Sequence, residues 1–244
     1  MPDWFDILSS TCELPMRAIK ELCDVGFTII PGPVATDHLA TLVAAYDSAV
    51  ATAKEEDVKN GSTTTRIRDF VNRGAKFDDL YIYWPVLEAC CRVIGQPFRL
   101  STMHARTVRA RSQAQALHVD YARDAIGWTM IGFIFMVDEF SGDNGATRFL
   151  PASHHWSTVP DKLIKDPQED YENQILACGP PGSVIIYNGA IWHGHAANSS
   201  DQPRRSIQGA YIRREAWSGE NLPERICNDT LARISSLARY VLAV

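Results

Sequence analysis

Gly-Ser-Val-Ile-Ile-Tyr-Asn-Gly-Ala-Ile-Trp-His, residues 182–193, decides the fold of this 244-residue chain. A glycine turn leads into a buried β run, a second turn follows, and a short strand ends in His193. Ser-Ile-Gln-Gly-Ala-Tyr-Ile-Arg at 206–213 then predicts another strand. Short apolar strands separated by turn residues indicate a mainly β core.

Three residues far apart in the sequence have the composition of an iron site. They are His118 and Asp120, in His-Val-Asp, and His193. Two imidazoles and one carboxylate on one face of a divalent metal leave positions open for a chelating cosubstrate and O2, which suits non-haem Fe(II) oxygenases. The His-x-Asp pair alone is a weak signal, because roughly 0.5 such pairs are expected by chance in a chain of this composition. Whether this pair marks an iron site therefore depends on the sequence around it.

Arg204 and Ser206 lie two positions apart at the start of the 206–213 strand. Residues two apart on a strand share a face, so a guanidinium and a hydroxyl can point into the same cavity. A guanidinium can hold a carboxylate bidentately, and the hydroxyl adds a donor. The pair suits the far end of a dicarboxylate whose other end chelates the metal. Arg205 is the competing candidate, but it falls on the opposite face.

These residues carry a family resemblance. His118-Val119-Asp120, the run Asn144-Gly-Ala-Thr-Arg-Phe-Leu-Pro-Ala-Ser-His154, and His193 followed by Arg204-Arg205-Ser206 resemble the phytanoyl-CoA dioxygenase family of Fe(II)/2-oxoglutarate oxygenases in order, spacing and flanking strands. The resemblance runs from about Ala18 to Arg213, and its last third is the most specific part.

The resemblance implies a double-stranded β-helix, the jelly-roll or cupin-like core. In it, His118, Asp120 and His193 would bind Fe(II), and Arg204 would pair with the C5 carboxylate of 2-oxoglutarate. Thr147 lies in a run whose strand faces the pocket in this family, and whether its hydroxyl reaches 2-oxoglutarate is open. His195 is a departure, because the family often has a small hydroxyl residue there.

The implied activity is that of an Fe(II)- and 2-oxoglutarate-dependent dioxygenase. Oxidative decarboxylation of 2-oxoglutarate with O2 would release succinate and CO2, and oxidation of a substrate C–H bond would follow. In related halogenases a small residue replaces the carboxylate ligand, so Asp120 favours hydroxylation or another oxidation. Desaturation, epoxidation and rearrangement stay open. We expect a small organic substrate, preferably a secondary metabolite, since no cluster of basic residues suits a CoA nucleotide.

A second hypothesis is a cupin-like protein that binds or senses metal and dicarboxylate without turnover. The intact triad and Arg204 argue against it, because a sensor needs no open iron positions. Arg109 or Arg111 could supply a second cation for an acidic substrate or for the cosubstrate, and the sequence does not separate this from a surface role.

We expect one domain over residues 1–244. Its helical N-terminal part would cover about 1–97, its β-helix core about 98–215, and a C-terminal amphipathic helix about 221–243. Helices are predicted at 17–25, from about Asp37 as a capping residue, and at 78–93, while 27–30 is a β run. The polar stretch 54–76 is predicted to be an exposed excursion, either a lid or a plain loop. The barrel is expected to begin near Phe98, with long strands at 99–110 and 128–140, and 155–178 is a charged insertion.

Composition narrows the class of protein. Hydrophobic residues make up 45% of the chain, which is ample for a core, and the net charge of −5 without a Lys/Arg cluster argues against nucleic acid. No apolar stretch approaches the roughly 18 residues that span a bilayer, and the acidic N-terminus lacks the features of a signal peptide. We therefore expect a cytoplasmic enzyme with a small-molecule substrate and no membrane partner, and a homodimer stays open.

Overall fold

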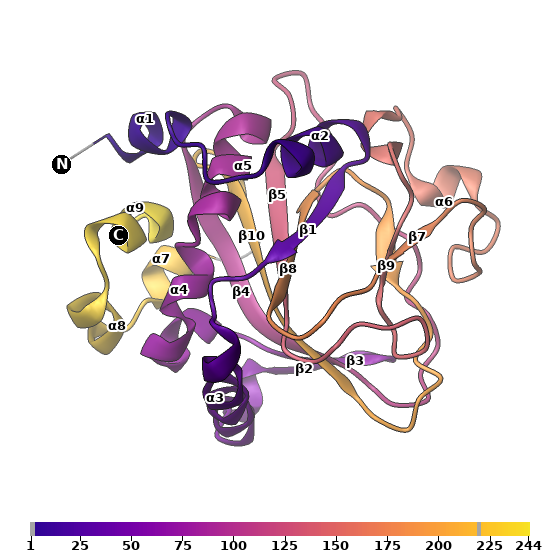
Figure 1. The fold of residues 1–244 in the computed structure, drawn as a ribbon, viewed down its shortest axis with the longest axis horizontal. Helices are drawn as coiled ribbons and strands as arrows, with labels where there is room; N and C mark the ends of the chain where they lie inside the picture. Colours follow the sequence, from indigo (N-terminus) through magenta and orange to yellow (C-terminus); the bar gives the residue numbers. More distant parts are fainter. Residues whose placement is uncertain (1–2, 219–220) are drawn as a thin grey trace.

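The computed structural model describes residues 3–218 and 221–244. Within them, two antiparallel sheets face each other in a double-stranded β-helix, with helices packed on the outer face of the larger sheet (Figure 1). The seven strands of the larger sheet run in the order β1-β8-β5-β10-β4-β3-β2, and the three of the smaller sheet in the order β7-β6-β9. Non-consecutive neighbours mean that the chain crosses repeatedly between the sheets. The expected mainly β, cupin-like fold is confirmed.

The strand bounds agree largely with the apolar patterns in the sequence. The strands are β1 Phe27–Pro31, β2 Val58–Asn60, β3 Thr64–Ile67, β4 Phe98–Val108, β5 Met130–Met136, β6 Thr147–Phe149, β7 Ile175–Ala177, β8 Ser183–Asn188, β9 His193–His195 and β10 Arg204–Arg213. His193 thus begins its strand, where the sequence predicted that it would end one. The turn at 189–192 is longer than expected because the chain crosses there from the large sheet to the small one.

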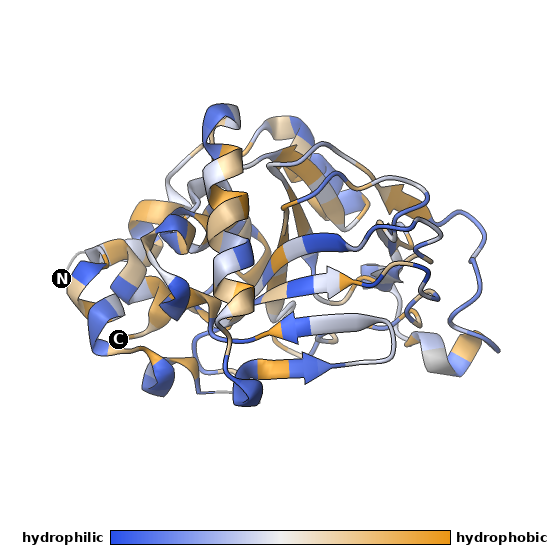
Figure 2. Ribbon diagram, turned by 90° about the horizontal axis from the view of Figure 1, so that it is seen from below, coloured by the Kyte–Doolittle hydropathy of each residue, from blue (hydrophilic) through white to orange (hydrophobic). Residues whose placement is uncertain are grey.

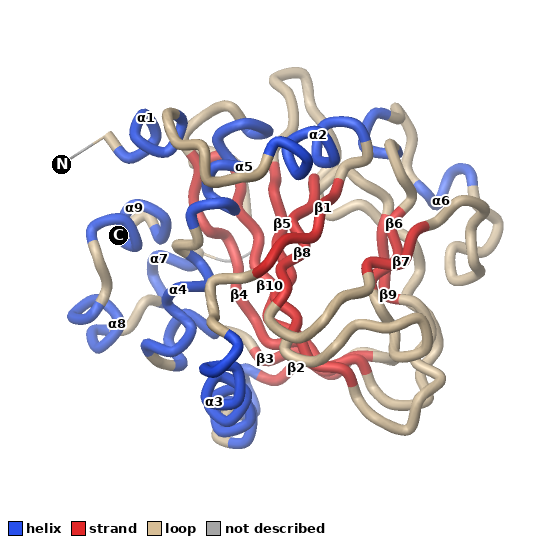
Figure 3. The backbone as a smooth tube through the Cα atoms, viewed as in Figure 1, coloured by secondary structure: helices blue, strands red, loops and turns tan. Residues whose placement is uncertain are grey.

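Most of the helices flank the large sheet on the side away from the small one, whereas α6 lies beside the small sheet (Figure 3). They are α1 Trp4–Ser9, α2 Met16–Asp24, α3 Leu39–Ala51, α4 Asp78–Tyr81, α5 Trp84–Ile94, α6 Pro160–Leu163, α7 Leu222–Arg225, α8 Asn228–Arg233 and α9 Ser236–Leu242. In the described residues, none is long and apolar enough to cross a membrane. Figure 2 shows that the connecting segment around α6 is mostly hydrophilic, as its charged sequence predicted.

Strand β5 illustrates why the core forms. Alternate side chains of Met-Ile-Gly-Phe-Ile-Phe-Met point to opposite faces. Phe133 and Phe135 pack toward the helices, whereas Ile134 and Met136 pack between the two sheets. Both faces are buried, so the strand is apolar throughout, and the sequence shows a continuous hydrophobic run in place of an alternating one.

Several boundary predictions were wrong. The β run predicted at 27–30 is present as β1, but β2 and β3 were not predicted and also join the large sheet, so the N-terminal part is not simply helical. The stretch 54–76 includes a hairpin that extends this sheet along β4, so neither the predicted lid nor the plain loop describes it fully. The tail at 221–243 forms three short helices in place of one, and α3 has no side-chain cap from Asp37. Local patterns did not show these tertiary pairings.

Candidate active site

The predicted metal ligands converge at one end of the space between the sheets. The ligand atoms of His118, Asp120 and His193 all lie within 4.8 Å of one another. The Nε2 atom of His118 lies 3.6 Å from Asp120 Oδ1, and that of His193 lies 3.4 Å from Asp120 Oδ2. Backbone hydrogen bonds in both directions between His118 and His193 hold the two segments together. The structure therefore brings the predicted triad together.

Both imidazoles are oriented for metal binding. His118 Nδ1 lies 3.0 Å from the Ala116 carbonyl oxygen, and His193 Nδ1 lies 2.9 Å from that of Ile191. An Nδ1–H that donates to a carbonyl leaves Nε2 as the free lone pair and fixes the ring orientation. The residues present therefore fit a divalent metal such as Fe(II), and a two-His, one-carboxylate set suits a redox-active iron.

Tyr187 orients the carboxylate ligand. Its hydroxyl donates to Asp120 Oδ2 over 2.8 Å, and its ring lies over Gly132, its partner across the sheet. A Cβ at Gly132 would come within 2.2 Å of the Tyr187 ring, so glycine is required there. Burial would raise the pKa of Asp120, but the imidazoles of His193 and His118 lower it well below its ordinary value. The carboxylate is accordingly ionised and ready to bind a cation.

Gly194 allows the close approach of the two ligand segments. A Cβ at this position would lie 2.9 Å from the Gln115 carbonyl oxygen and 3.1 Å from that of Ala116. Backbone atoms cannot move aside as a flexible side chain can. The glycine after His193 is therefore part of the construction of the site.

Arg204 is placed as the sequence predicted. Its side chain is buried, its Nη2 donates to the Gly145 carbonyl over 2.7 Å, and its guanidinium lies 3.8 Å from the ring centroid of Phe140. Among the residues that the structure describes, its Nε and Nη1 have no hydrogen-bond partner. Burial lowers the pKa of Arg204 to about 9. A buried cation with two free donors suits an incoming carboxylate.

The neighbouring candidates differ in placement. Arg205 lies on the other face and pairs with Asp138 and Asp47, so the structure does not place it in the cavity. Thr147 is buried on β6 and lines the cavity. Ser206 is fully buried, but its hydroxyl donates to the Arg106 carbonyl over 3.3 Å and it is not part of the cavity wall.

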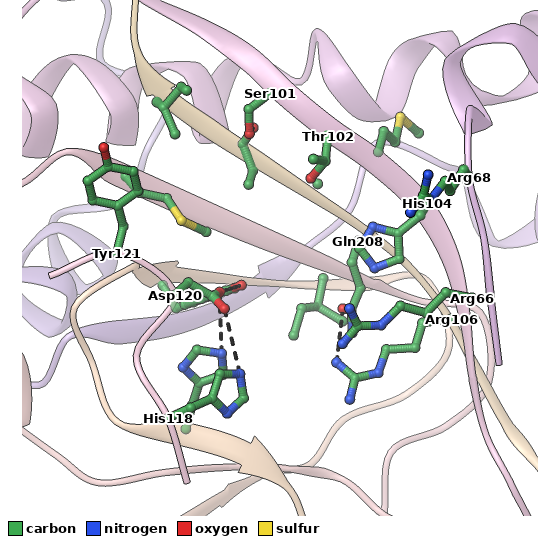
Figure 4. Close-up of a pocket in the computed structure, with 18 of the residues that line it drawn as sticks. Arg66, Arg68, Ser101, Thr102, His104, Arg106, His118, Asp120, Tyr121 and Gln208 are labelled. Carbon is green, nitrogen blue, oxygen red and sulfur yellow. Dashed lines mark hydrogen bonds and ion pairs between the residues drawn. The ribbon is translucent and has the colours of Figure 1, made fainter. Parts of the chain in front are cut away.

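The metal ligands and Arg204 line one cavity of about 430 Å³. Figure 4 shows His118 and Asp120 close together in this cavity. This volume lies in the range of small-molecule sites. The side-chain exposures of 33% for His118 and 29% for Asp120, against 8% for His193, show which side of the triad faces the opening. The arrangement can hold a metal with open positions beside an organic ligand.

Sequence reasoning missed four lining residues of the cavity wall, which are Arg66, His104, Arg106 and Gln115. The available signal was the alternation along the long predicted strand, whose even-numbered positions 104 and 106 share one face. Arg109 and Arg111, which were considered instead, bond to the hairpin at 60–62 and to Asp201. His195 also lines the cavity, and its Nε2 lies 2.9 Å from the Thr63 hydroxyl.

Comparison with known proteins agrees with this site. The profile of the phytanoyl-CoA dioxygenase (PhyH) family matches residues 22–206, which is most of the chain. The multifunctional dioxygenase prhA of Penicillium brasilianum is 27% identical over 212 residues, which cover 78% of this chain and 69% of that protein.

Solved structures share the fold. The non-heme alpha-ketoglutarate-dependent epimerase SnoN from nogalamycin biosynthesis superposes with a TM-score of 0.66 at 19% identity, covering 81% of this chain and 80% of that one. HygX from Streptomyces hygroscopicus, solved with nickel and 2-oxoglutarate bound, gives 0.65 at 15% identity, covering 83% and 88%.

Proposed function

Because the chain belongs to the phytanoyl-CoA dioxygenase family, we propose that it is an Fe(II)- and 2-oxoglutarate-dependent dioxygenase that hydroxylates a C–H bond of a small organic substrate. The observation that carries the proposal is the meeting, in one cavity, of a preoriented two-His, one-carboxylate triad and a buried arginine with two unpartnered donors. A secondary metabolite is the proposed kind of substrate, and the support is that SnoN, which shares the fold, comes from nogalamycin biosynthesis.

His118, Asp120 and His193 would hold the metal. The backbone carbonyls of Ala116 and Ile191 accept from Nδ1 of the two imidazoles and so turn Nε2 of each ring toward the metal position, and the Tyr187 hydroxyl holds the carboxylate in place beside them. When bound, iron and 2-oxoglutarate supply the oxidation of a C–H bond by O2, with release of succinate and CO2. The protein supplies the orientation and the anionic ligand.

Arg204 would bind the C5 carboxylate of 2-oxoglutarate through Nε and Nη1. Thr147 is proposed as a further donor, because it is buried and lines the cavity. Ser206 is proposed to help position Arg204 indirectly. Its hydroxyl donates to the Arg106 carbonyl oxygen and so ties β10, which carries Arg204, to β4. Burial of the site excludes water around these groups, which strengthens their attraction for the dianion.

The test is an anaerobic titration of metal-free protein with Fe(II) and then 2-oxoglutarate, followed by the visible charge-transfer band of the chelate. We expect the band with the native protein and its loss in His118→Ala and His193→Ala, whereas His155→Ala, a change at an exposed residue, should retain it. Succinate release under air then distinguishes an oxygenase from a metal- and dicarboxylate-binding protein. Metal binding without the band would contradict the proposal.

A further inference from the structure

Arg148 is a fully buried arginine outside the cavity. It lies on β6 between Thr147, which lines the cavity, and Phe149, which packs between the two sheets. Because successive side chains of a strand point to opposite faces, the Arg148 side chain lies on the outer face of the small sheet. Its relative exposure is nonetheless 0%. Arginine is almost never fully buried unless its charge and its donors are satisfied, so this burial needs a structural reason.

The loop 164–174, between α6 and β7, covers Arg148 and is here called the outer loop. Figure 1 shows α6 and the chain that follows it on the side of the small sheet away from the large one. The carboxylate of Asp170 compensates the charge only weakly, because its side chain is 84% exposed. The guanidinium instead donates to three consecutive backbone carbonyl oxygens of the outer loop over 2.6 to 3.1 Å, those of Pro167, Gln168 and Glu169.

The same guanidinium also holds the segment that ends in His118. Its Nη2 donates to the Gln115 carbonyl oxygen over 2.9 Å. The outer loop adds a backbone hydrogen bond from Leu117 N to the Pro167 carbonyl oxygen, also over 2.9 Å. Between these two residues lies Ala116, whose carbonyl oxygen accepts from His118 Nδ1 and orients this metal ligand. Arg148 and the outer loop therefore hold the residue on each side of the one that orients the imidazole.

Gly194 lets Arg148 reach this segment. It is the register partner of Arg148 on β9, and β9 lies between β6 and residues 115–118. Directly opposite residues of neighbouring strands have their side chains on the same face, and glycine leaves that face open. A Cβ at Gly194 would lie 2.9 Å from the Gln115 carbonyl oxygen, the atom to which Arg148 donates. The guanidinium can therefore cross the outer face of β9.

His118 is the metal-binding imidazole that most needs such support. Its side chain is 33% exposed, against 8% for His193, so fewer packing contacts restrain it. None of the described residues of the outer loop lines the cavity. The outer loop therefore acts on the site through residues 115–118, from behind the ligand.

We propose that Arg148 is a positioning residue of the metal site. With the outer loop it holds residues 115–118 against β9 and so fixes the direction of His118 Nε2. The proposal rests on the proposed function, since it requires that the triad bind a metal. Coupling between two sites is reciprocal, so a metal bound at the triad should in turn order the outer loop.

The first test measures Mn(II) affinity of the full chain by competition with a chelator. Arg148→Met removes the donors but keeps an unbranched side chain in the buried space. We expect its Mn(II) affinity to fall at least about tenfold, as when other groups that orient a metal ligand are removed. Arg148→Lys keeps the charge but lacks the planar fork, so it should lose less affinity.

Arg233→Met is the matched control. Arg233 also donates to a backbone carbonyl oxygen, that of Val71, and it pairs with Asp78. Neither partner lines the cavity. Arg233→Met should therefore lower the unfolding temperature and leave Mn(II) affinity unchanged, which separates a loss of positioning from a general loss of stability.

The second test uses the native protein and needs no variant. Hydrogen exchange of backbone amides is compared with and without Mn(II). We expect Mn(II) to slow exchange in peptides from the outer loop, although the loop lies outside the cavity, and to leave exchange in α8 unchanged. A loop that only adds stability to the fold would not respond to the metal in this way.

Two results would overturn the role of Arg148. One is native Mn(II) affinity in both Arg148 variants, or a loss in Arg148→Met no larger than that in Arg233→Met. The other is exchange in the outer loop that Mn(II) does not change. If Arg148→Met does not fold, Arg148→Lys and the exchange experiment decide. The anaerobic charge-transfer band separates the two hypotheses, because its absence in the native protein refutes the proposed function, whereas its presence with either result refutes only the role of Arg148.

Discussion

Replacement of Arg204 by methionine should weaken 2-oxoglutarate binding without weakening the fold. Arg204 has two unpartnered donors, Nε and Nη1, in a buried site. The charge-assisted pair they would form with a carboxylate is worth about 2 to 3 kcal/mol, because hydrogen bonds to charged groups contribute about 1.5 to 3 kcal/mol and paired bonds are not additive. The dissociation constant for 2-oxoglutarate should therefore rise about 30- to 150-fold.

Arg205→Met is the matched control. The two arginines are neighbours on β10, but Arg205 pairs outside the cavity with Asp138 and Asp47. Its replacement removes two partly exposed ion pairs, which contribute little to stability, and should leave the affinity for 2-oxoglutarate unchanged. Arg204→Met removes a buried cation that forms no ion pair within residues 3–218 and 221–244, and this relief offsets the loss of its hydrogen bond to the Gly145 carbonyl. The unfolding temperature of the metal-free variant should therefore stay close to that of the native protein.

The assay is the anaerobic titration of the Fe(II)-loaded variants with 2-oxoglutarate, with thermal unfolding of each metal-free variant beside it. Native affinity in Arg204→Met would refute the reasoning, as would a loss found only in Arg205→Met. Arg204→Lys adds a geometric test, because lysine keeps the charge but lacks the planar fork. We expect it to recover only part of the affinity.

Three further predictions concern the metal site and its surroundings. Tyr187→Phe keeps the ring over the sheet but removes the hydrogen bond to Asp120, and metal affinity measured by chelator competition should fall about 10- to 100-fold; unchanged affinity would show that the hydroxyl does not orient the ligand. Gly194→Ala should separate the two ligand segments and lower metal affinity at least as much, with the far-ultraviolet circular dichroism retained; tight binding would contradict the steric argument. Burial lowers the pKa of His104 to about 3 and of His154 to about 4, below their unfolded values, so the unfolded chain binds more protons in acid. Stability of the metal-free protein should therefore fall from pH 6.5 toward pH 4, by about 1.4 kcal/mol per pH unit for each histidine, and urea unfolding of the His→Gln variants should show a smaller slope.

The family, the triad and Arg204 were all predictable from the sequence. The reason is that their signals are local. Successive side chains of a strand point to opposite faces, so the sequence alone assigns Arg204 and Arg205 to opposite faces of their strand. Continuous apolar runs likewise located β5 and β8, which are buried on both faces. The placement of the triad residues in one site agrees with the prediction.

Other features depended on which strands become neighbours. The hairpin at 58–67 looks polar along the sequence, yet pairing with β4 carries Arg66 to a position opposite Arg106 in the cavity. The space for Tyr187 depends on Gly132, more than fifty residues away, lying across the sheet from it. The pattern of residues along one strand shows which of its faces is buried. It does not show which other strand pairs with it, or in which register. The packing of the whole core sets the register between strands. This register therefore decided that Arg66 lies opposite Arg106, and that Tyr187 has room to hydrogen-bond to Asp120.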